Sequence, residues 1–198
     1  MRLIVQKYGG TSVADIEKIT TIAKRVARLY DQGNNLVIVL SAMAGVTDNI
    51  IDMAHQAVNQ PDKREMDVLL STGEQTTVAL LAMILISMKY PAQSLLGFQA
   101  DIKTSSSHGK ARIRDISASR IKELIAKRKI VIVAGFQGHN KHGDITTLGR
   151  GGSDTSAVAI AAAIKADSCE IYTDVKGIYT TDPNICKKAC KLDKISYD

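Results

Sequence analysis

The hydrophobic positions of this chain form short continuous runs separated by segments with helical spacing. Runs at 2–6, 36–40 and 130–134 are typical of strands that are buried on both faces of a sheet. Between Asp15 and Gln32 apolar residues recur every three to four positions, which predicts a helix with Gly33 directly after its last turn. The alternation predicts an α/β fold in which helix layers cover both faces of an open, mostly parallel sheet.

The remaining segments extend this pattern along the chain. Further strands are expected at 93–96, 113–116 and 170–173. Further helices are expected from 46 to about 59, from 72 to 86, from 117 to 128 and after Gly152, with Thr72, Gly73 and Glu74 opening the second of them. Residues 104–110 and 135–152 are expected to be loops. No repeat or linker interrupts the order, so the 198 residues predict one domain.

Charge and cysteine content narrow the classes of function. The formal net charge of +6 suits ligands that carry phosphate. Nucleic-acid binding is disfavoured, because the chain has no Trp and the basic residues of 120–129 alternate with Ile and Leu. Three cysteines without metal-ligand spacing indicate structural thiols and a cytoplasmic setting. The longest apolar stretch, 78–86, is too short to span a bilayer, and the first residues do not form a signal peptide, so no membrane partner is expected.

Residues 147–158, T-L-G-R-G-G-S-D-T-S-A-V, carry the strongest indication of a binding site. They lead into an alanine-rich apolar run, so the glycines lie where a helix N-terminus presents free N–H groups to an anion. Arg150 adds a planar guanidinium suited to a carboxylate or phosphate. Asp154 beside such a site indicates a metal, a lysine or a reacting group to be oriented. The alternative is an ordinary helix start with Ser153 as its N-cap.

Other loops also follow apolar strands, and ligands of open parallel sheets bind where such loops meet. Lys7 precedes Gly9 and Gly10, an arrangement that can hold phosphates, although a strand-end lysine in solvent has the same pattern. The loop is not a Walker A motif, and the protein-kinase motifs H-R-D and D-F-G are absent from the sequence. Ser41 and Thr47 can hydrogen-bond a small polar ligand or cap a helix.

Three further groups each leave two interpretations open. Glu74 is expected in the first turn of its helix, where an acid is favoured in any case, and in a site it would pair with an ammonium. A late strand and turn contains Tyr179, which suits a purine or ribose, but the same residues suit a β-turn. The third group is a loop cluster that can be a metal site or a set of solvated side chains, namely His139, His142 and Asp144.

Together these segments resemble the aspartate kinases of the amino-acid kinase superfamily. The match covers nearly the whole chain in family order, in K-Y-G-G-T-S-V (7–13), S-A-M-A-G-V-T-D (41–48), S-T-G-E-Q (71–75), V-A-G-F-Q-G (133–138), I-T-T-L-G-R-G-G-S-D-T-S-A (145–157) and Y-T-D-V-K-G-I-Y-T-T-D-P (172–183). The resemblance implies a carbamate kinase-like three-layer sandwich. It also implies that residues 1–198 are a catalytic domain incomplete at its C-terminus, with the regulatory ACT domains absent.

The resemblance further implies a reaction and a role for each matching residue. The γ-phosphoryl of ATP, with Mg²⁺ held mainly by the nucleotide phosphates, would pass to the side-chain carboxylate of L-aspartate. The product would be 4-phospho-L-aspartate, the first step toward lysine, threonine and methionine, and the full-length protein would be a homo-oligomer. Lys7 and Asp154 would be catalytic. The acceptor would contact Ser41, Thr47, Glu74, Arg150 and Ser153. The nucleotide would contact Lys7, Tyr8, Gly9, Gly10, Thr173, Asp174, Tyr179, Thr180, Thr181, Asp182, Pro183 and Asn184.

Two other functions fit part of the same pattern. A kinase acting on another acid, such as glutamate, would share the phosphate-binding loops. A non-catalytic nucleotide-binding or regulatory subunit would bind ATP without aspartate-dependent release of ADP. The chain on its own is expected to be weakly active or inactive, because members of the family continue past its last residue.

Overall fold

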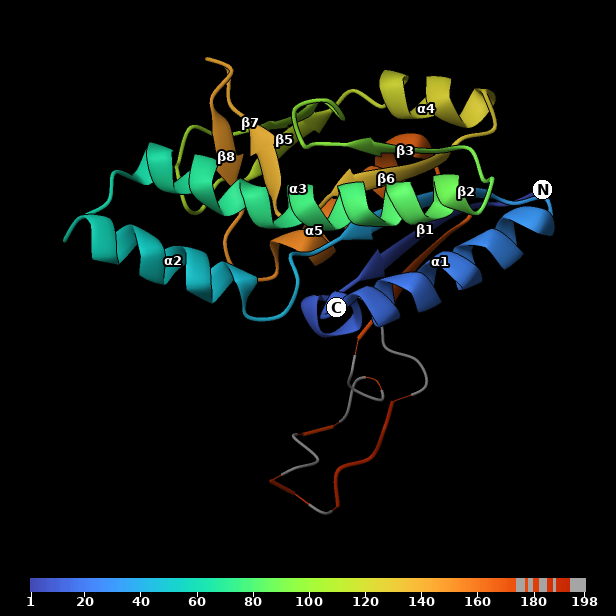
Figure 1. Ribbon diagram of the computed structural model, residues 1–198, viewed down its shortest axis with the longest axis horizontal. Coiled ribbons are helices and arrows are strands. Elements are labelled where there is room, and N and C mark those ends of the chain that lie inside the picture. Colours follow the sequence, from blue (N-terminus) through green and yellow to red (C-terminus); the bar gives the residue numbers. More distant parts are fainter. Residues whose placement is uncertain (174–176, 178–179, 182–184, 187, 193–198) are drawn as a thin grey trace.

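A parallel five-stranded sheet forms the centre of the protein (Figure 1). The structure is a computed structural model, and it describes residues 1–173, 177, 180–181, 185–186 and 188–192. The strands of this sheet, in chain order, are β1 (Leu3–Tyr8), β2 (Asn35–Leu40), β3 (Ala92–Leu95), β6 (Ile130–Ala134) and β9 (Ser168–Tyr172). Each of them lies within two residues of its predicted position. The prediction is strongest for β2 and β6, because a continuous run of β-branched and apolar residues is a strong strand pattern.

The strand order β3-β6-β2-β1-β9 brings four strand ends together. Tyr8 at the end of β1 is paired with Leu40 of β2 and with Tyr172 of β9, and Leu40 is paired in turn with Ala134 of β6. All of these pairs are parallel, so the loops that follow the four strands leave from one edge of the sheet. That edge is where the sequence predicts a ligand site.

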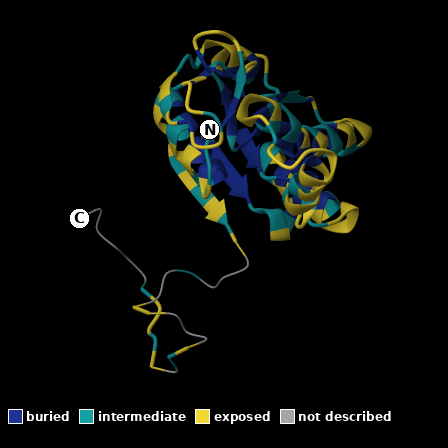
Figure 2. Ribbon diagram, turned by 90° about the vertical axis from the view of Figure 1, so that its left-hand side faces the viewer, coloured by how far each residue is buried: buried dark blue, intermediate teal, exposed yellow. Residues whose placement is uncertain are grey.

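Helices cover both faces of the sheet, as predicted (Figure 1). On one face α1 (Ile16–Asp31) and α3 (Lys63–Ser87) pack on alternate strand residues such as Ile38, and on the other α4 (Ser119–Ala126) and α5 (Gly152–Ile164) pack on residues such as Val39. Figure 2 shows the buried strands enclosed by helices that are exposed on their outer sides. Because successive strand residues point to opposite faces, one residue of β1 packs against the layer of α1 and α3 and the next against the layer of α4 and α5.

A second sheet lies beside α3 and was not predicted as a unit. Its order is β5-β4-β7-β8, with bounds Ile113–Ile116 for β5, Ile102–Thr104 for β4, Gln137–His139 for β7 and Ile145–Thr147 for β8. Only β5 was expected, and the expectation of a loop throughout 135–152 is wrong. Strands of three residues are too short to display an alternating pattern, so the sequence gives them no distinct period.

Helix α3 begins nine residues before its predicted start. Asp62 is its N-cap, and the Asp62 carboxylate accepts hydrogen bonds from the backbone N–H groups of Arg64 (2.9 Å) and Glu65 (3.1 Å). The expectation that Glu74 lies in a first turn is therefore wrong, because Glu74 lies in the middle of a 25-residue helix. An acid three residues after a capping side chain is a helix-start pattern, and Asp62 with Glu65 provides it.

The same helix is long and apolar enough, by length and composition, to cross a membrane. Its most apolar 18-residue window has a mean hydropathy of 1.5, so the expectation drawn from 78–86 alone understated its apolar character. In the structure α3 contacts α1, α2 (Val46–Ala57) and strands β3 and β6, and 44% of that window is buried. These contacts are those of a helix that packs in the core of a domain.

Candidate active site

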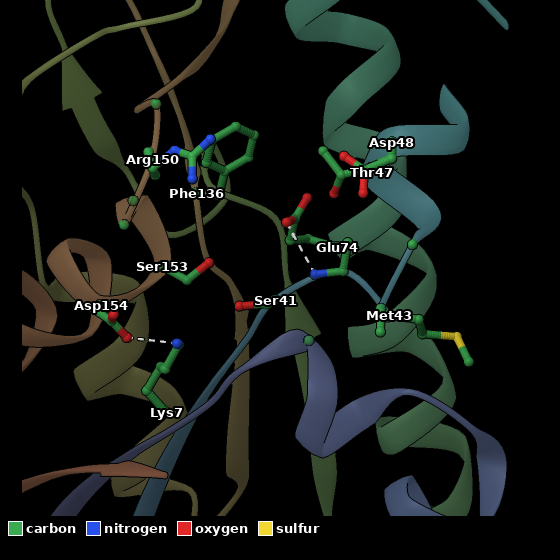
Figure 3. A pocket seen from close by; sticks show the side chains of 17 residues that line it. Lys7, Ser41, Met43, Thr47, Asp48, Glu74, Phe136, Arg150, Ser153 and Asp154 are labelled. Carbon is green, nitrogen blue, oxygen red and sulfur yellow. Dashed lines mark hydrogen bonds and ion pairs between the residues drawn. The ribbon is translucent and has the colours of Figure 1, made fainter. Parts of the chain in front are cut away.

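A pocket of about 350 Å³ lies at the edge of the sheet where β1 and β2 end. All seven residues predicted for catalysis or acceptor binding line it, although they come from four separate parts of the chain. Figure 3 shows Arg150, Ser153 and Asp154 on one side and Thr47, Asp48 and Glu74 on the other. The complete lining is Lys7, Gly10, Ser41, Ala42, Met43, Ala44, Gly45, Thr47, Asp48, Glu74, Phe136, Gly149, Arg150, Gly151, Gly152, Ser153 and Asp154.

Lys7 and Asp154 form an ion pair at the base of the pocket (Figure 3). Lys7 Nζ lies 2.6 Å from Asp154 Oδ1, and the Lys7 side chain is 10% exposed. The pair forms because Lys7 lies on the face of β1 that α5 covers, and Asp154 lies in the first turn of α5. A buried amine needs such a partner, and a carboxylate that holds it fixes where its positive charge lies. A strand-end lysine in solvent, the alternative left open by the sequence, is not what the structure has.

The N-terminus of α5 opens into the pocket beside Arg150. Gly151 is the N-cap, with φ of 76°, and no side chain caps the helix, so the alternative of Ser153 as N-cap is wrong. The Gly149 φ of 80° is also left-handed, and glycine adopts this conformation without strain. Within the described part of the chain, the Arg150 side chain forms no hydrogen bond or ion pair. Free helix N–H groups and an unpaired guanidinium together favour an anion here.

Glu74 supplies the opposite charge on the far wall. Its Oε1 accepts a hydrogen bond from the Ala42 backbone N–H at 3.0 Å, and its buried Oε2 has no hydrogen-bond partner among the described residues. Glu74 is 4% exposed, and burial raises its pKa from 4.5 to about 7, although the Ala42 N–H opposes the shift. A buried carboxylate oxygen without a donor suits a cation that brings its own N–H groups, such as an ammonium.

Gly73 allows α3 to approach closely enough for this contact. A Cβ placed on Gly73 would lie 2.8 Å from the Ala42 Cβ, well inside van der Waals contact. The glycine that sequence reasoning interpreted as part of a helix start is therefore a close-packing residue in mid-helix. It places Glu74 against the loop that follows β2.

That loop supplies hydroxyl groups and a second helix N-terminus. Ser41 follows β2, and its backbone N–H donates to the Tyr8 carbonyl at 3.2 Å. Thr47 lies in the first turn of α2, whose N-cap is Gly45 with φ of 78° and no side-chain cap, so Thr47 does not cap the helix. Both residues line the pocket, as does Asp48, which the sequence prediction did not single out. Asp48 and Phe136 lie inside the motifs 41–48 and 133–138, and this position is the sequence feature that could have identified them as site residues.

The family comparison covers almost the entire chain. Residues 2–198 match the amino acid kinase family. The chain belongs to the amino acid kinase family. An aspartate kinase of Stutzerimonas stutzeri is 56% identical to it over all 198 residues, which make up 48% of that protein. The chain spans about half the length of the curated relatives it matches. The resemblance to aspartate kinases is thus confirmed.

Solved structures give this amino acid kinase the same fold. The crystal structure of an aspartate kinase from Synechocystis matches with a TM-score of 0.80 at 49% identity, over 95% of this chain and 31% of that one. The Escherichia coli aspartokinase III in complex with aspartate and ADP matches with a TM-score of 0.83 at 29% identity, over 96% of this chain and 53% of that one. The predicted α/β class, with a parallel sheet between helix layers, is confirmed.

The predicted nucleotide residues of this amino acid kinase do not all reach the pocket. Gly10 lines it, whereas a Cβ on Gly9 would lie 3.4 Å from Lys7 Nζ. Tyr8 is 3% exposed and points to the opposite face of the sheet, where its ring stacks on Tyr172 with centroids 4.8 Å apart. Burial raises the pKa of the Tyr8 phenol far above its ordinary value.

The remaining nucleotide residues follow β9. Thr173 lines a second cavity, of about 340 Å³, with Tyr8 and Tyr172. Thr180 and Thr181 are exposed. The last group lies outside the described residues, namely Asp174, Tyr179, Asp182, Pro183 and Asn184. Their predicted roles stay predictions.

The predicted cluster of His139, His142 and Asp144 does not form a single site in this amino acid kinase, because His139 and Asp144 contact other side chains. His139 Nε2 lies 3.0 Å from Asp101 Oδ1, and Asp144 accepts hydrogen bonds from Asn140 and Arg64. Within the described residues there is no group of three or more His, Cys, Asp or Glu side chains that can hold a metal ion.

Proposed function

We propose that this chain supplies the phosphoryl-transfer site of an aspartate kinase. The reaction moves the γ-phosphoryl group of ATP to the side-chain carboxylate of L-aspartate and gives 4-phospho-L-aspartate. The observation that carries the proposal is a pocket with an acid, Glu74, on one wall and a cation, Arg150, on the other, neither of which has an ion-pair partner among the described residues. An α-amino acid brings an ammonium and a carboxylate in the complementary arrangement. Identities of 49–56% to aspartokinases over the whole chain support the same acceptor.

In this proposal the chain acts by position and charge rather than by proton transfer. The acceptor carboxylate is ionised at neutral pH, so it needs no general base. One of its oxygens forms the new bond to phosphorus, the bond from phosphorus to the β–γ bridging oxygen breaks, and ADP leaves with that electron pair. Lys7 and the N–H groups at the start of α5 offset the negative charge on the transferred group. Asp154 holds the Lys7 amine in place.

The nucleotide brings Mg²⁺ with it in this proposal. When bound with the nucleotide, Mg²⁺ would supply charge neutralisation at the phosphates. Lys7 and the backbone of Gly10 and Ser153 are the residues on this chain that would hold the phosphates. As the family resemblance implies, we also propose that the reaction is the first step toward lysine, threonine and methionine. The protein would work in the cytoplasm as a homo-oligomer.

The test is ADP release from Mg-ATP with and without L-aspartate, with hydroxylamine present to trap the acyl phosphate. We expect aspartate-stimulated release together with hydroxamate, weaker in this chain alone than in an aspartate kinase of full length, and little of either with L-glutamate. Preferential use of glutamate would assign a different acceptor. ATP binding without aspartate-dependent release would instead support a non-catalytic nucleotide-binding subunit.

A further inference from the structure

Asp67 is a fully buried carboxylate that lies outside the pocket. It is 0% exposed and lies on α3, two helical turns before Glu74. Burying a carboxylate destabilises a fold unless hydrogen bonds replace the lost water. Here Oδ1 accepts from the Gly109 backbone N–H at 3.0 Å and from the Thr147 hydroxyl, and Oδ2 lies 2.7 Å from His108 Nδ1.

The partners of Asp67 adjoin the loop that carries Arg150. Thr147 is the last residue of β8, three positions before Arg150. A Cβ on Gly149 would lie 3.4 Å from the Gly109 carbonyl oxygen, so these two backbones are in contact. The Ala111 N–H also donates to the Thr147 carbonyl at 2.8 Å. One carboxylate therefore holds both the strand that enters the Arg150 loop and the segment packed against that loop.

Arg150 depends on these backbone contacts for its position. Among the described residues no partner restrains its side chain, which is exposed. It is flanked by Gly149 and Gly151, both in the left-handed region, where glycine is also the most mobile residue. The loop backbone is held by hydrogen bonds from the Leu148 N–H to the Phe136 carbonyl (2.9 Å) and from the Gly152 N–H to the Gly149 carbonyl (3.0 Å), so the position of Arg150 follows the backbone and what holds the ends of the loop.

Helix α3 carries Asp67 and Glu74 seven residues apart, and such positions lie on the same helical face. Glu74 contacts the loop after β2 on one wall of the pocket, and Asp67 holds the loop on the other wall. We propose that Asp67 is a positioning residue that sets the separation of Arg150 and Glu74, and thereby the affinity of the pocket for an α-amino acid. The inference rests on the proposed function in taking an amino acid as the acceptor.

The first test is Asp67→Asn, with Asp52→Asn on the exposed side of α2 as a matched control. Each variant is assayed for KM and kcat and titrated calorimetrically with L-aspartate and with Mg-ATP. For Asp67→Asn we expect the KM and Kd for L-aspartate to rise about tenfold, since small displacements of positioning groups have effects of that size or larger. The Kd for ATP should change by less than about twofold, and the control should match the wild type.

A second pair of variants keeps the carboxylate in place. Thr147→Val removes the hydroxyl that donates to Asp67, whereas Thr147→Ser retains it. We expect Thr147→Val to weaken aspartate binding and Thr147→Ser to restore it. Trypsin cleavage after Arg150, followed by mass spectrometry, reports on the loop without any assay of activity. Cleavage should be faster in Asp67→Asn and Thr147→Val than in the wild type and Thr147→Ser.

Two results would overturn the inference. One is an aspartate affinity and a cleavage rate in Asp67→Asn that match the wild type. The other is an equal loss of ATP and aspartate affinity with a lower Tm, which would mean general destabilisation. If the wild type neither binds L-aspartate nor releases ADP in response to it, the proposed function fails, and the cleavage rates still decide whether Asp67 holds the Arg150 loop.

Discussion

Burial destabilises the ionised form of Glu74, because one N–H donor replaces only part of the lost water. The pKa of Glu74 rises from 4.5 to about 7 as a result. Between these values the folded chain binds a proton that the unfolded chain does not bind. The contribution of Glu74 to stability therefore falls as pH rises through this range, and above pH 7 its charge becomes available for an ammonium.

Glu74→Gln separates the effect of Glu74 on the stability of the fold from its effect on the binding of an ammonium. At pH 8 we expect the variant to unfold with a free energy larger by on the order of 2 kcal/mol, because no buried charge remains. At pH 4.5, where the acid is protonated, the two proteins should be equally stable. Aspartate affinity at pH 8 should fall in the variant. Urea unfolding at both pH values tests the prediction, with exposed Glu17→Gln as the control. A stability change of the same size at both pH values would contradict it.

Asp154→Asn tests the ion pair at the base of the pocket. The Lys7 amine loses the carboxylate 2.6 Å away and with it a fixed position. We expect kcat to fall about a hundredfold, the usual size of the loss of one aligned charge at a transferred group. The Kd for ATP should change much less, since helix N–H groups also contribute to binding. Single-turnover kinetics and calorimetry measure the two quantities, and equal losses would remove the proposed role.

At the level of elements, α3 is the part of the fold on which both walls of the pocket depend. Gly73→Ala should destabilise the protein, although alanine is the better helix former by about 1 kcal/mol. The new Cβ would lie 2.8 Å from the Ala42 Cβ and would push α3 away from the loop after β2. Urea unfolding and aspartate affinity should both decline, while exposed Thr72→Ala should leave both unchanged. A more stable Gly73→Ala would show that propensity outweighs the clash.

The elements that the sequence predicts well are those whose pattern is local. Helix α1 has an apolar stripe, a capping Asp15 and Gly33 beyond its end, and it was predicted to within one residue. The start of α3 was missed because Gly73, a close-packing residue, imitates a boundary. The strands β7 and β8 were missed because three residues cannot show a period.

The site also has residues that local sequence patterns predict and residues that they do not. The pocket residues Lys7, Arg150 and Glu74 lie in glycine-rich or polar motifs that stand out in the sequence. The contact between Asp67 and His108 joins residues 41 positions apart, and neither belongs to such a motif. A pairing of this kind depends on how α3 and the second sheet pack, which no local pattern specifies.

For the whole molecule, the central sheet is the main source of stability. Ile132→Ala on β6 should lower the free energy of unfolding by about 3 kcal/mol, because the residue is fully buried and its removal leaves a cavity. Met83→Ala on α3 should change it by less than about 0.5 kcal/mol, since Met83 is 58% exposed. Urea unfolding of both variants tests this, and similar losses would contradict the arrangement of the core.

The place of β1 inside the sheet, between β2 and β9, has a consequence for synthesis on the ribosome. Lys7 leaves the exit tunnel well before its carboxylate partner on α5, which follows it by more than a hundred residues. Until then the nascent chain lacks the counter-charge and one neighbour of its first strand. The pocket can therefore form only after α5 has been made, and the sheet encloses β1 on both sides only once β9 has followed it.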